Sequence, residues 1–384
     1  MVQLKLSIVC DYQEECWHSM DICAEMLLEN LNSSEDRQIT IDQILPKFNP
    51  RLQKIPRLGN KNFFFNADRL LNRFWDYPNH LGKKLKEGGS DFYHIVDHSY
   101  AQLVHVLPHQ RVGVYCHDLD AFRSILEPEK ELRPAWYRSM SRRILSGLQS
   151  AEIVFYSTAQ IRKEIEQYNL IESSRLVQAP LGISPEFTPY VDHDPTAETI
   201  LKQIGDAPYI LHIGSCIPRK RIDVLLDVFG RLRAIYPHLL LVKIGGQWTQ
   251  NQSQQILDKG LHESIIHLHN LHRSTIARLY QRSLAVLLTS EAEGFGLPVI
   301  EALACGTVVV ASDIAVLKEV GGKGALYCPL GEVDTWTDLV AQLIVNPEMA
   351  PALELKLAQA GKYSWSSHAA IIKKSYMNLA GISS

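Results

Sequence analysis

A glycine-rich loop is the feature of this sequence best suited to chemistry. An apolar run at 285–289 precedes it, and its centre reads Gly294-Phe295-Gly296-Leu297. Pro298 suits the first turn of a following helix, which Gly306 would end. Such a strand, loop and helix let backbone amides and a helix N-terminus approach a phosphate closely. The loop has neither the third glycine of a dinucleotide-binding fingerprint nor the lysine of a P-loop.

Two glutamates accompany this loop. Glu293 directly precedes its first glycine, and Glu301 lies eight residues later, inside the expected helix. Both carboxylates can therefore face one ligand. A carboxylate repels phosphate, but it accepts hydrogen bonds from the hydroxyl groups of sugars and ribose. The alternative is an ordinary loop and surface helix with two unrelated glutamates, which the spacing alone leaves open.

Three consecutive cations follow another apolar run. Arg219-Lys220-Arg221 comes after 209–213 and opens an expected helix. Lysine and arginine at the carboxyl end of a strand can neutralise a diphosphate, and lysine does so as a flexible point charge. Cations are mildly unfavourable at a helix N-terminus, so a bound anion would explain them. A solvated basic helix start is the alternative.

A histidine follows a strand in the first half of the chain. His117 comes directly after the apolar run 112–116 and is the best catalytic candidate there. The alternative is a capped turn, because Asp118 and Asp120 are common turn residues.

Other polar and aromatic residues lie on the same predicted sheet edge. His98 and Tyr100 follow the run at 92–96 and could bind hydroxyl groups of a sugar or an acceptor. A structural turn is the alternative for both. Trp17, beyond the first strand, could shape an acceptor pocket, and Ser19 is a plausible N-cap for the helix that follows.

Short β-branched runs that alternate with helical stretches must position these residues. Several runs lack period-2 alternation, as expected of strands buried on both faces of a parallel sheet. The expected strands are 4–10, 38–41, 92–96, 111–116, 153–157, 175–179, 209–213, 239–244, 265–269, 285–289, 307–311 and 325–328. This order predicts α/β architecture with helices on both faces of the sheets.

The alternation pauses once, near the middle of the chain. Prolines and acidic residues gather there, which is typical of a linker. We therefore expect an N-terminal domain at 1–185, a linker at 186–205 and a C-terminal domain at 206–361. A final helical segment at 362–384 is expected to pack back on the N-terminal domain.

The glutamate spacing resembles the E-x7-E motif of the retaining glycosyltransferases of family 4. Other segments similar to that family are 157–158, 179–183, 212–221 and 363–365. The resemblance is strong over 209–329 and weaker at the N-terminus, where acceptors bind in this family. It implies the GT-B fold, in which two Rossmann-like, doubly wound domains face each other across a ligand-binding cleft.

The resemblance also implies roles for individual residues. Glu293 would contact the donor sugar, Glu301 the ribose and Lys220 the diphosphate. The implied catalytic residues are His117 and Glu293. The candidate acceptor-binding residues are Trp17, His98 and Tyr100. The implied donor-binding residues are Gly214, Ser215, Arg219, Lys220, Gly294, Phe295, Gly296, Leu297 and Glu301.

Two departures from the family stand out. Many relatives place an arginine where this chain has Ser215. Either Arg219 supplies the second cation that holds the diphosphate beside Lys220, or the diphosphate is held more weakly. The Gly-Gly loop that many relatives carry after the first strand is absent.

The implied reaction moves a hexosyl group from a UDP- or GDP-linked sugar to a sugar, glycolipid or polysaccharide acceptor. The anomeric configuration would be retained, with the leaving phosphate taking the acceptor proton. No pair of carboxylates typical of retaining glycosidases was found in the first half. We expect no metal and no cofactor, because the His-x-x-x-His spacings do not fit one helix face.

Composition limits the partners. The 384 residues include 39 basic and 42 acidic ones, a net charge of −3 that argues against nucleic acid. No apolar run approaches the ~20 residues of a membrane helix. Seven scattered cysteines and no signal-peptide layout indicate a cytoplasmic protein. Mixed basic and aromatic residues at 47–86 suit peripheral contact with the inner face of a membrane, or a plain core.

Two other functions use the same features. A non-catalytic nucleotide-sugar-binding protein would bind the donor without turnover. A nucleotide-sugar epimerase would need an acid/base constellation, which the sequence does not reveal. Fold alone does not decide among these, but the two glutamates together with Lys220 favour transfer.

Overall fold

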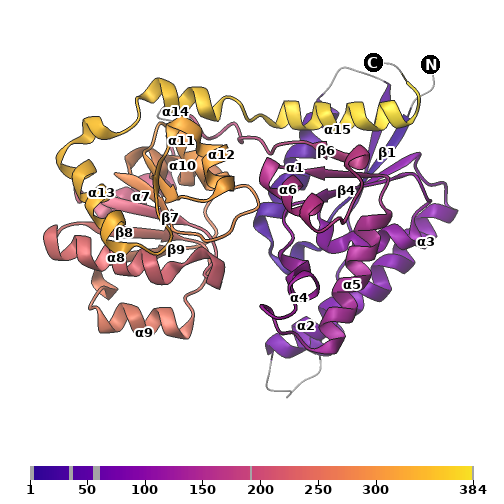
Figure 1. Ribbon diagram of the computed structural model, residues 1–384, viewed down its shortest axis with the longest axis horizontal. Coiled ribbons are helices and arrows are strands. Elements are labelled where there is room, and N and C mark those ends of the chain that lie inside the picture. Colours follow the sequence, from indigo (N-terminus) through magenta and orange to yellow (C-terminus); the bar gives the residue numbers. More distant parts are fainter. Residues whose placement is uncertain (1–3, 34–37, 55–60, 191–192, 383–384) are drawn as a thin grey trace. The chain divides into compact units, whose positions relative to one another are not determined.

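The computed structural model describes residues 4–33, 38–54, 61–190 and 193–382 (Figure 1). The chain forms two compact units, Met1–Leu181 with Trp365–Ser384, and Gly182–Ser364. Each unit is built around one six-stranded sheet, and every strand pair in both sheets is parallel. The α/β class expected from the alternating runs is confirmed.

The sheet of the N-terminal unit has the strand order β2-β1-β3-β4-β5-β6. Its strands are β1 (Leu4–Val9), β2 (Ile39–Ile44), β3 (Phe92–Ile95), β4 (Val112–Cys116), β5 (Ile153–Tyr156) and β6 (Leu176–Gln178). The winding direction reverses between β1 and β3, and ligands of doubly wound folds bind outside the carboxyl ends of the strands at such a point.

Helices cover this sheet. They are α1 (His18–Asn32), α2 (Lys61–Leu71), α3 (Tyr77–Lys86), α4 (Arg123–Leu126), α5 (Ala135–Ser150) and α6 (Ala159–Gln167). A π-helical turn, Asn72–Asp76, joins α2 to α3. The N-cap of α1 is Trp17 rather than the expected Ser19, which lies inside the first turn.

The last helix belongs to the N-terminal unit. Helix α15 (Trp365–Leu379), yellow in Figure 1, packs against α1. Ile372 and Tyr376 are fully buried there. The Tyr376 hydroxyl donates to the carbonyl oxygen of Tyr93 at 3.1 Å, and so it ties the end of the chain to β3.

The sheet of the C-terminal unit has the order β12-β11-β10-β7-β8-β9. Its strands are β7 (Tyr209–Ile213), β8 (Leu240–Ile244), β9 (Ile265–Leu268), β10 (Ala285–Leu288), β11 (Val309–Ser312) and β12 (Leu326–Cys328). This is the strand order of a dinucleotide-binding fold, with its switch point between β7 and β10.

Eight helices are described in this unit. They are α7 (Pro195–Ile204), α8 (Ile222–Ile235), α9 (Gln250–Asp258), α10 (Arg273–Arg282), α11 (Leu297–Ala304), α12 (Ala315–Gly321), α13 (Val333–Val345) and α14 (Leu353–Ala360). Leu225, Phe229 and Leu232 recur at helical spacing on α8 and are fully buried, which holds that amphipathic helix on the sheet.

The segment expected to be a linker differs from the prediction. Helix α7 occupies half of 186–205, and the C-terminal unit begins already at Gly182. The Asp194 side chain caps α7 by accepting from the Ala197 amide at 2.7 Å, and it accepts from the Ser274 hydroxyl at 2.6 Å. These bonds tie α7 to α10. The proline and acidic residues of this segment therefore mark the start of a helix rather than a linker.

Candidate functional site

Two loops of the C-terminal unit meet at the switch point of its sheet. One follows β7 and carries Arg219 and Lys220; the other follows β10 and carries Glu293. Because β7 and β10 are neighbours, residues 73 apart in sequence come into contact. The Glu291 amide donates to the Arg219 carbonyl oxygen at 2.8 Å, which fixes the two loops to each other.

An ion pair lies at the centre of this site. Lys220 Nζ donates to Glu293 Oε1 at 2.5 Å, and the Ser290 hydroxyl donates to the same oxygen at 2.7 Å. Arg219 lies 3.6 Å from Glu293 Oε2 and donates to the Ala292 carbonyl oxygen at 3.0 Å. The structure therefore brings together three residues that the sequence assigned to one donor site.

These contacts keep Glu293 charged. Burial alone would raise the pKa of Glu293, but the Lys220 ammonium and the Arg219 guanidinium lower that pKa below its usual value. The site thus presents a carboxylate that accepts hydrogen bonds beside cations that bind anions.

Glu301 has different surroundings on α11. Its Oε2 accepts from the Tyr280 hydroxyl at 3.0 Å. Burial raises the pKa of Glu301 to about 7, although the Tyr280 hydroxyl and Arg273 oppose that shift. At neutral pH this carboxyl is divided between its two protonation states.

The glycine-rich loop leads into α11 as expected. Gly296 has φ +94, a backbone conformation that residues with a side chain rarely adopt, and a Cβ there would lie 2.8 Å from Leu317. Phe295 is buried edge-on against the Tyr363 ring, with centroids 5.4 Å apart. Leu297 is the first residue of α11, with Pro298 in the first turn. Gly294, the first residue of the loop, directly follows Glu293 in the sequence.

The turn after β7 contains Gly214 and Ser215. Gly214 has φ +154, and a Cβ there would lie 3.9 Å from Lys220 Cε. Ser215 is half-buried against Gly246, whose own Cβ would lie 2.7 Å from the Ser215 Cα. Ser215 thus stands at the site without the arginine side chain that many relatives of the predicted family have.

Sequence reasoning missed Lys243 and Gly246, which support this turn from β8. Lys243 is fully buried and donates to the Gly214 carbonyl oxygen at 2.7 Å. The available signal was a lysine inside an apolar run that ends in two glycines.

In the N-terminal unit, His117 follows β4 and is buried. Its Nε2 lies 2.8 Å from the Val96 carbonyl oxygen, which requires the Nε2–H form, and its amide donates to His98 Nδ1 at 3.2 Å. Burial lowers the pKa of His117, with Asp97 opposing. The structure therefore joins the two predicted histidines, with His117 neutral at pH 7.

Tyr100 and Trp17 share one arginine. Arg73, from the π-helical turn, lies 4.1 Å over the Tyr100 ring and 5.7 Å over the Trp17 ring. The Tyr100 hydroxyl donates to Glu15 Oε1 at 2.9 Å. Tyr100 is buried whereas Trp17 is half-buried, so Trp17 is the more accessible of the two predicted acceptor residues.

Asp11 is a further polar residue that the sequence reasoning did not assign. It stands at the carboxyl end of β1, buried, and its oxygens have no hydrogen-bond partner among the described residues. Burial and the neighbouring Asp97 carboxylate raise the pKa of Asp11 well above its usual value. An acidic residue directly after an apolar run was the signal available.

Comparison with known proteins places this chain. A sequence model of the family described as glycosyl transferases group 1 matches residues 196–361. Residues 196–361 form a group 1 glycosyltransferase domain. The matched range contains both loops of the Lys220–Glu293 site.

Curated proteins similar to this chain include bacterial mannosyltransferases. The chain is 28% identical over 267 residues to O-antigen chain mannosyltransferase B of Escherichia coli, covering 67% of this chain and 68% of that protein. It is 26% identical over 273 residues to serotype-specific mannosyltransferase WbdA of Escherichia coli, covering 69% of this chain but only 33% of that protein.

Solved structures share the whole fold. Sucrose-phosphate synthase from Thermosynechococcus elongatus matches with a TM-score of 0.77 and 17% identity, over 99% of this chain and 100% of that chain. Anabaena Alr3699/HepE in complex with UDP-glucose matches with a TM-score of 0.72 and 15% identity, over 98% and 100% of the two chains. The fold of this chain is therefore GT-B, as the family resemblance predicted.

Proposed function

We propose that the protein is a retaining glycosyltransferase that moves a hexosyl group from a UDP- or GDP-linked sugar to a carbohydrate, glycolipid or polysaccharide acceptor. The contact between Lys220 and Glu293 at the switch point carries the proposal. It joins a diphosphate-binding cation to a hydroxyl-binding carboxylate inside a group 1 glycosyltransferase domain. Mannose is the first hexose to test, because the curated relatives are named mannosyltransferases.

A bound donor would divide the ion pair. Lys220 and Arg219 would take the diphosphate, while Glu293 would accept hydrogen bonds from sugar hydroxyls. Together with the N-terminus of α11, the cations would stabilise the charge that develops on the departing diphosphate. No metal takes part in this proposal, because the leaving phosphate itself would accept the proton from the acceptor hydroxyl.

The other predicted residues complete the proposal. Glu301 would accept from the ribose hydroxyls, and Gly294 through Leu297 would line the donor. His117 is the catalytic candidate of the N-terminal unit, and Trp17, His98 and Tyr100 remain candidates for acceptor binding.

The test is a panel of UDP-glucose, GDP-mannose and ADP-glucose, scored by release of free nucleoside diphosphate with and without sugar and lipid acceptors. Glu293→Gln should reduce release by about 100-fold or more, because it removes a charged contact to the reacting sugar. Glu291→Gln is the matched control, since the Glu291 side chain is exposed and forms an ion pair with Arg221 at 3.5 Å, away from the Lys220–Glu293 contact. NMR of the product anomer would report retention.

Three outcomes separate the alternatives. Binding of a nucleotide sugar without any turnover, even with sugar and lipid acceptors added, would indicate a non-catalytic nucleotide-sugar-binding protein. Interconversion of the sugar without transfer would indicate an epimerase. Failure of the wild-type protein to bind any nucleotide sugar would refute the donor site itself.

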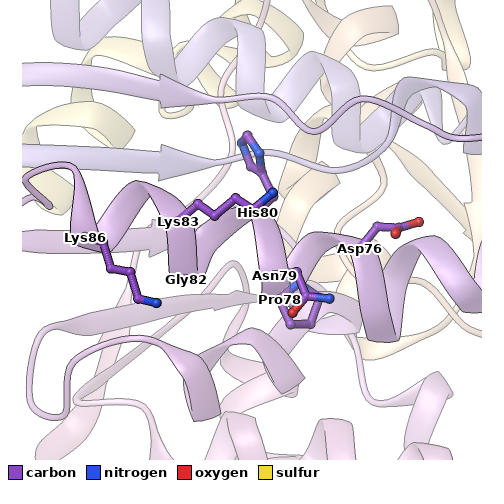
Figure 2. A pocket seen from close by; sticks show the side chains of 7 residues that line it. All are labelled: Asp76, Pro78, Asn79, His80, Gly82, Lys83 and Lys86. Carbon is purple, nitrogen blue, oxygen red and sulfur yellow. The ribbon is translucent and has the colours of Figure 1, made fainter.

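We also propose a cytoplasmic location with peripheral contact to an anionic membrane through residues 47–86. Phe63 and Trp75 are 63% and 68% exposed on α2 and the π-helical turn. The pocket in Figure 2 adds cations of α3, because Lys83 and Lys86 line it together with His80. Exposed aromatic rings and cations together favour the headgroup region of a membrane. No described helix is long and apolar enough to span a bilayer. Residues 55–60 of the range 47–86, Arg57 among them, lie outside the described residues.

Vesicle sedimentation tests this contact. Trp75→Ser should weaken binding to vesicles containing phosphatidylglycerol by several-fold, because an indole ring that inserts into the headgroup region of a membrane contributes strongly to binding. Tyr190→Ser is the control, because Tyr190 is 77% exposed but lies in the C-terminal unit. Equal binding by wild type and both variants would refute the proposed surface.

A further inference from the structure

A buried lysine supports two turns of the donor site from beneath. Lys243 lies in β8, and its side chain is fully buried. Its Nζ donates to the carbonyl oxygens of Gly214 at 2.7 Å, Gly245 at 3.0 Å and Ile244 at 3.1 Å. An ammonium group has three protons, and these three acceptors use all of them.

The turns that Lys243 joins lie in direct backbone contact. A Cβ on Gly246 would lie 2.6 Å from the Cys216 amide nitrogen, and a Cβ on Gly245 would lie 3.0 Å from the Gly214 carbonyl oxygen. Only glycines allow so close an approach. The turns that follow β7 and β8 thus pack directly against each other, and Lys243 forms hydrogen bonds to both.

This arrangement directs backbone donors away from the lysine. In a trans peptide the carbonyl and the following N–H point in opposite directions. Because the Gly214 and Gly245 carbonyls point at Lys243, the amides of Ser215 and Gly246 point away from it. Neither amide donates a hydrogen bond within the part of the chain that the structure describes. Two unused amides on glycine turns form an anion-binding concavity.

The charge of Lys243 has no counterion. No carboxylate of a described residue forms an ion pair with it, whereas Glu293 pairs with Lys220. A buried charge without a partner is costly, so an anion at the turns would stabilise this arrangement. Burial lowers the pKa of Lys243 to about 8, so the group is still largely protonated at pH 7.

We infer that Lys243 is a positioning residue of the donor site: it fixes the two glycine turns so that the Ser215 and Gly246 amides meet the diphosphate of the nucleotide sugar, and its buried charge favours that anion from behind the turns. This inference rests on the proposed function and extends it to a residue that does not itself touch the donor.

The test compares three ligands of one base by calorimetry on the full-length protein. They are the nucleoside diphosphate that wild type binds best among UDP, GDP and ADP, the matching monophosphate, and the nucleoside. Lys243→Met should weaken diphosphate binding by about 10- to 100-fold, the size of a lost charge-assisted contact, and leave nucleoside binding unchanged. Lys243→Arg, which keeps the charge and several donors, should restore most of the diphosphate affinity.

Lys356→Met is the matched control. Lys356 is also buried and donates to one carbonyl oxygen, that of Gly306 at 2.5 Å. It should lower the melting temperature without changing the ratio of diphosphate to nucleoside affinity. If Lys243→Met does not fold, Lys243→Gln keeps an amide donor for the same carbonyls and carries the same comparison.

The outcomes are distinct. Equal losses for all three ligands would assign Lys243 to folding alone and overturn the inference, as would unchanged diphosphate affinity in a folded variant. If wild type binds no nucleoside diphosphate at all, the proposed function fails and the inference fails with it.

Discussion

Glu293 and Glu301 lie eight residues apart, yet their surroundings give them opposite protonation preferences. The two cations beside Glu293 hold its pKa below the usual value, so it stays ionised. Among the described residues, Glu301 has only the Tyr280 hydroxyl as a direct hydrogen-bond partner, and burial raises the pKa of Glu301 to about 7. The first carboxylate therefore stays ionised at physiological pH, whereas the charge of the second responds to pH.

The stability of the protein should record this difference. A carboxyl group whose pKa is raised in the folded state favours the fold most at low pH. Its contribution is lost as pH rises from about 4.5, the value without burial, through about 7. Glu301→Gln removes this dependence. Relative to wild type, we expect the variant to gain about 1–3 kcal/mol of unfolding free energy between pH 5 and pH 8.

Urea denaturation at both pH values measures this gain. Glu291→Gln, which changes an exposed side chain, should show no gain in unfolding free energy relative to wild type between these pH values. A constant difference between Glu301→Gln and wild type at pH 5 and pH 8 would mean that Glu301 is already ionised in the folded protein.

At the scale of elements, the turns after β7 and β8 depend on glycine for space. Gly246→Ala places a methyl group 2.6 Å from the Cys216 amide nitrogen, so backbone must move. We expect a loss of about 1–3 kcal/mol of unfolding free energy. Nucleoside diphosphate affinity should fall about tenfold, because the Ser215 turn moves away from the anion.

Gly230→Ala provides the comparison for that change. Gly230 lies in α8, and an added Cβ would be no closer than 3.6 Å to any neighbour. Alanine favours a helix by about 0.5–1 kcal/mol over glycine, so this variant should be as stable as wild type or more so. Denaturation and calorimetry measure both effects. Normal donor affinity in Gly246→Ala would show that the spacing of the turns does not matter for binding.

At the scale of the whole molecule, the last helix completes the first unit. Tyr376 of α15 is fully buried, and its ring lies 5.5 Å from that of Phe92 and 5.9 Å from that of Phe155. Tyr376→Ala should cost about 3–5 kcal/mol, the usual range for truncating a large buried ring. Tyr376→Phe removes only the hydroxyl group, which donates to the Tyr93 carbonyl oxygen and lies 3.1 Å from His94 Nδ1, and should cost about 1 kcal/mol.

Hydrogen exchange can locate this loss. Amides of β3 and β4 should exchange faster in Tyr376→Ala, while those of β7 and β10 keep their protection, because α15 belongs to the N-terminal unit. Equal deprotection in both units would contradict the assignment of α15.

The sequence by itself determined the elements and the chemical types present. All twelve expected strands occur, most within one or two residues of their predicted ends, because a fully buried parallel strand is a short apolar run. The glycine-rich loop and the start of α11 were equally readable, since Pro298 and Gly296 act through local backbone geometry. The E-x7-E resemblance pointed to glycosyltransferases, and a group 1 glycosyltransferase model matches residues 196–361.

Only the tertiary structure decided which elements became neighbours. Lys220 meets Glu293 because β10 lies beside β7, and strand order depends on packing that no local pattern encodes. The same applies to Lys243, whose three acceptors come from two turns, and to α7 inside the expected linker. Local propensity fixes helices and strands, but long-range burial fixes their order, and the candidate site arises from that order.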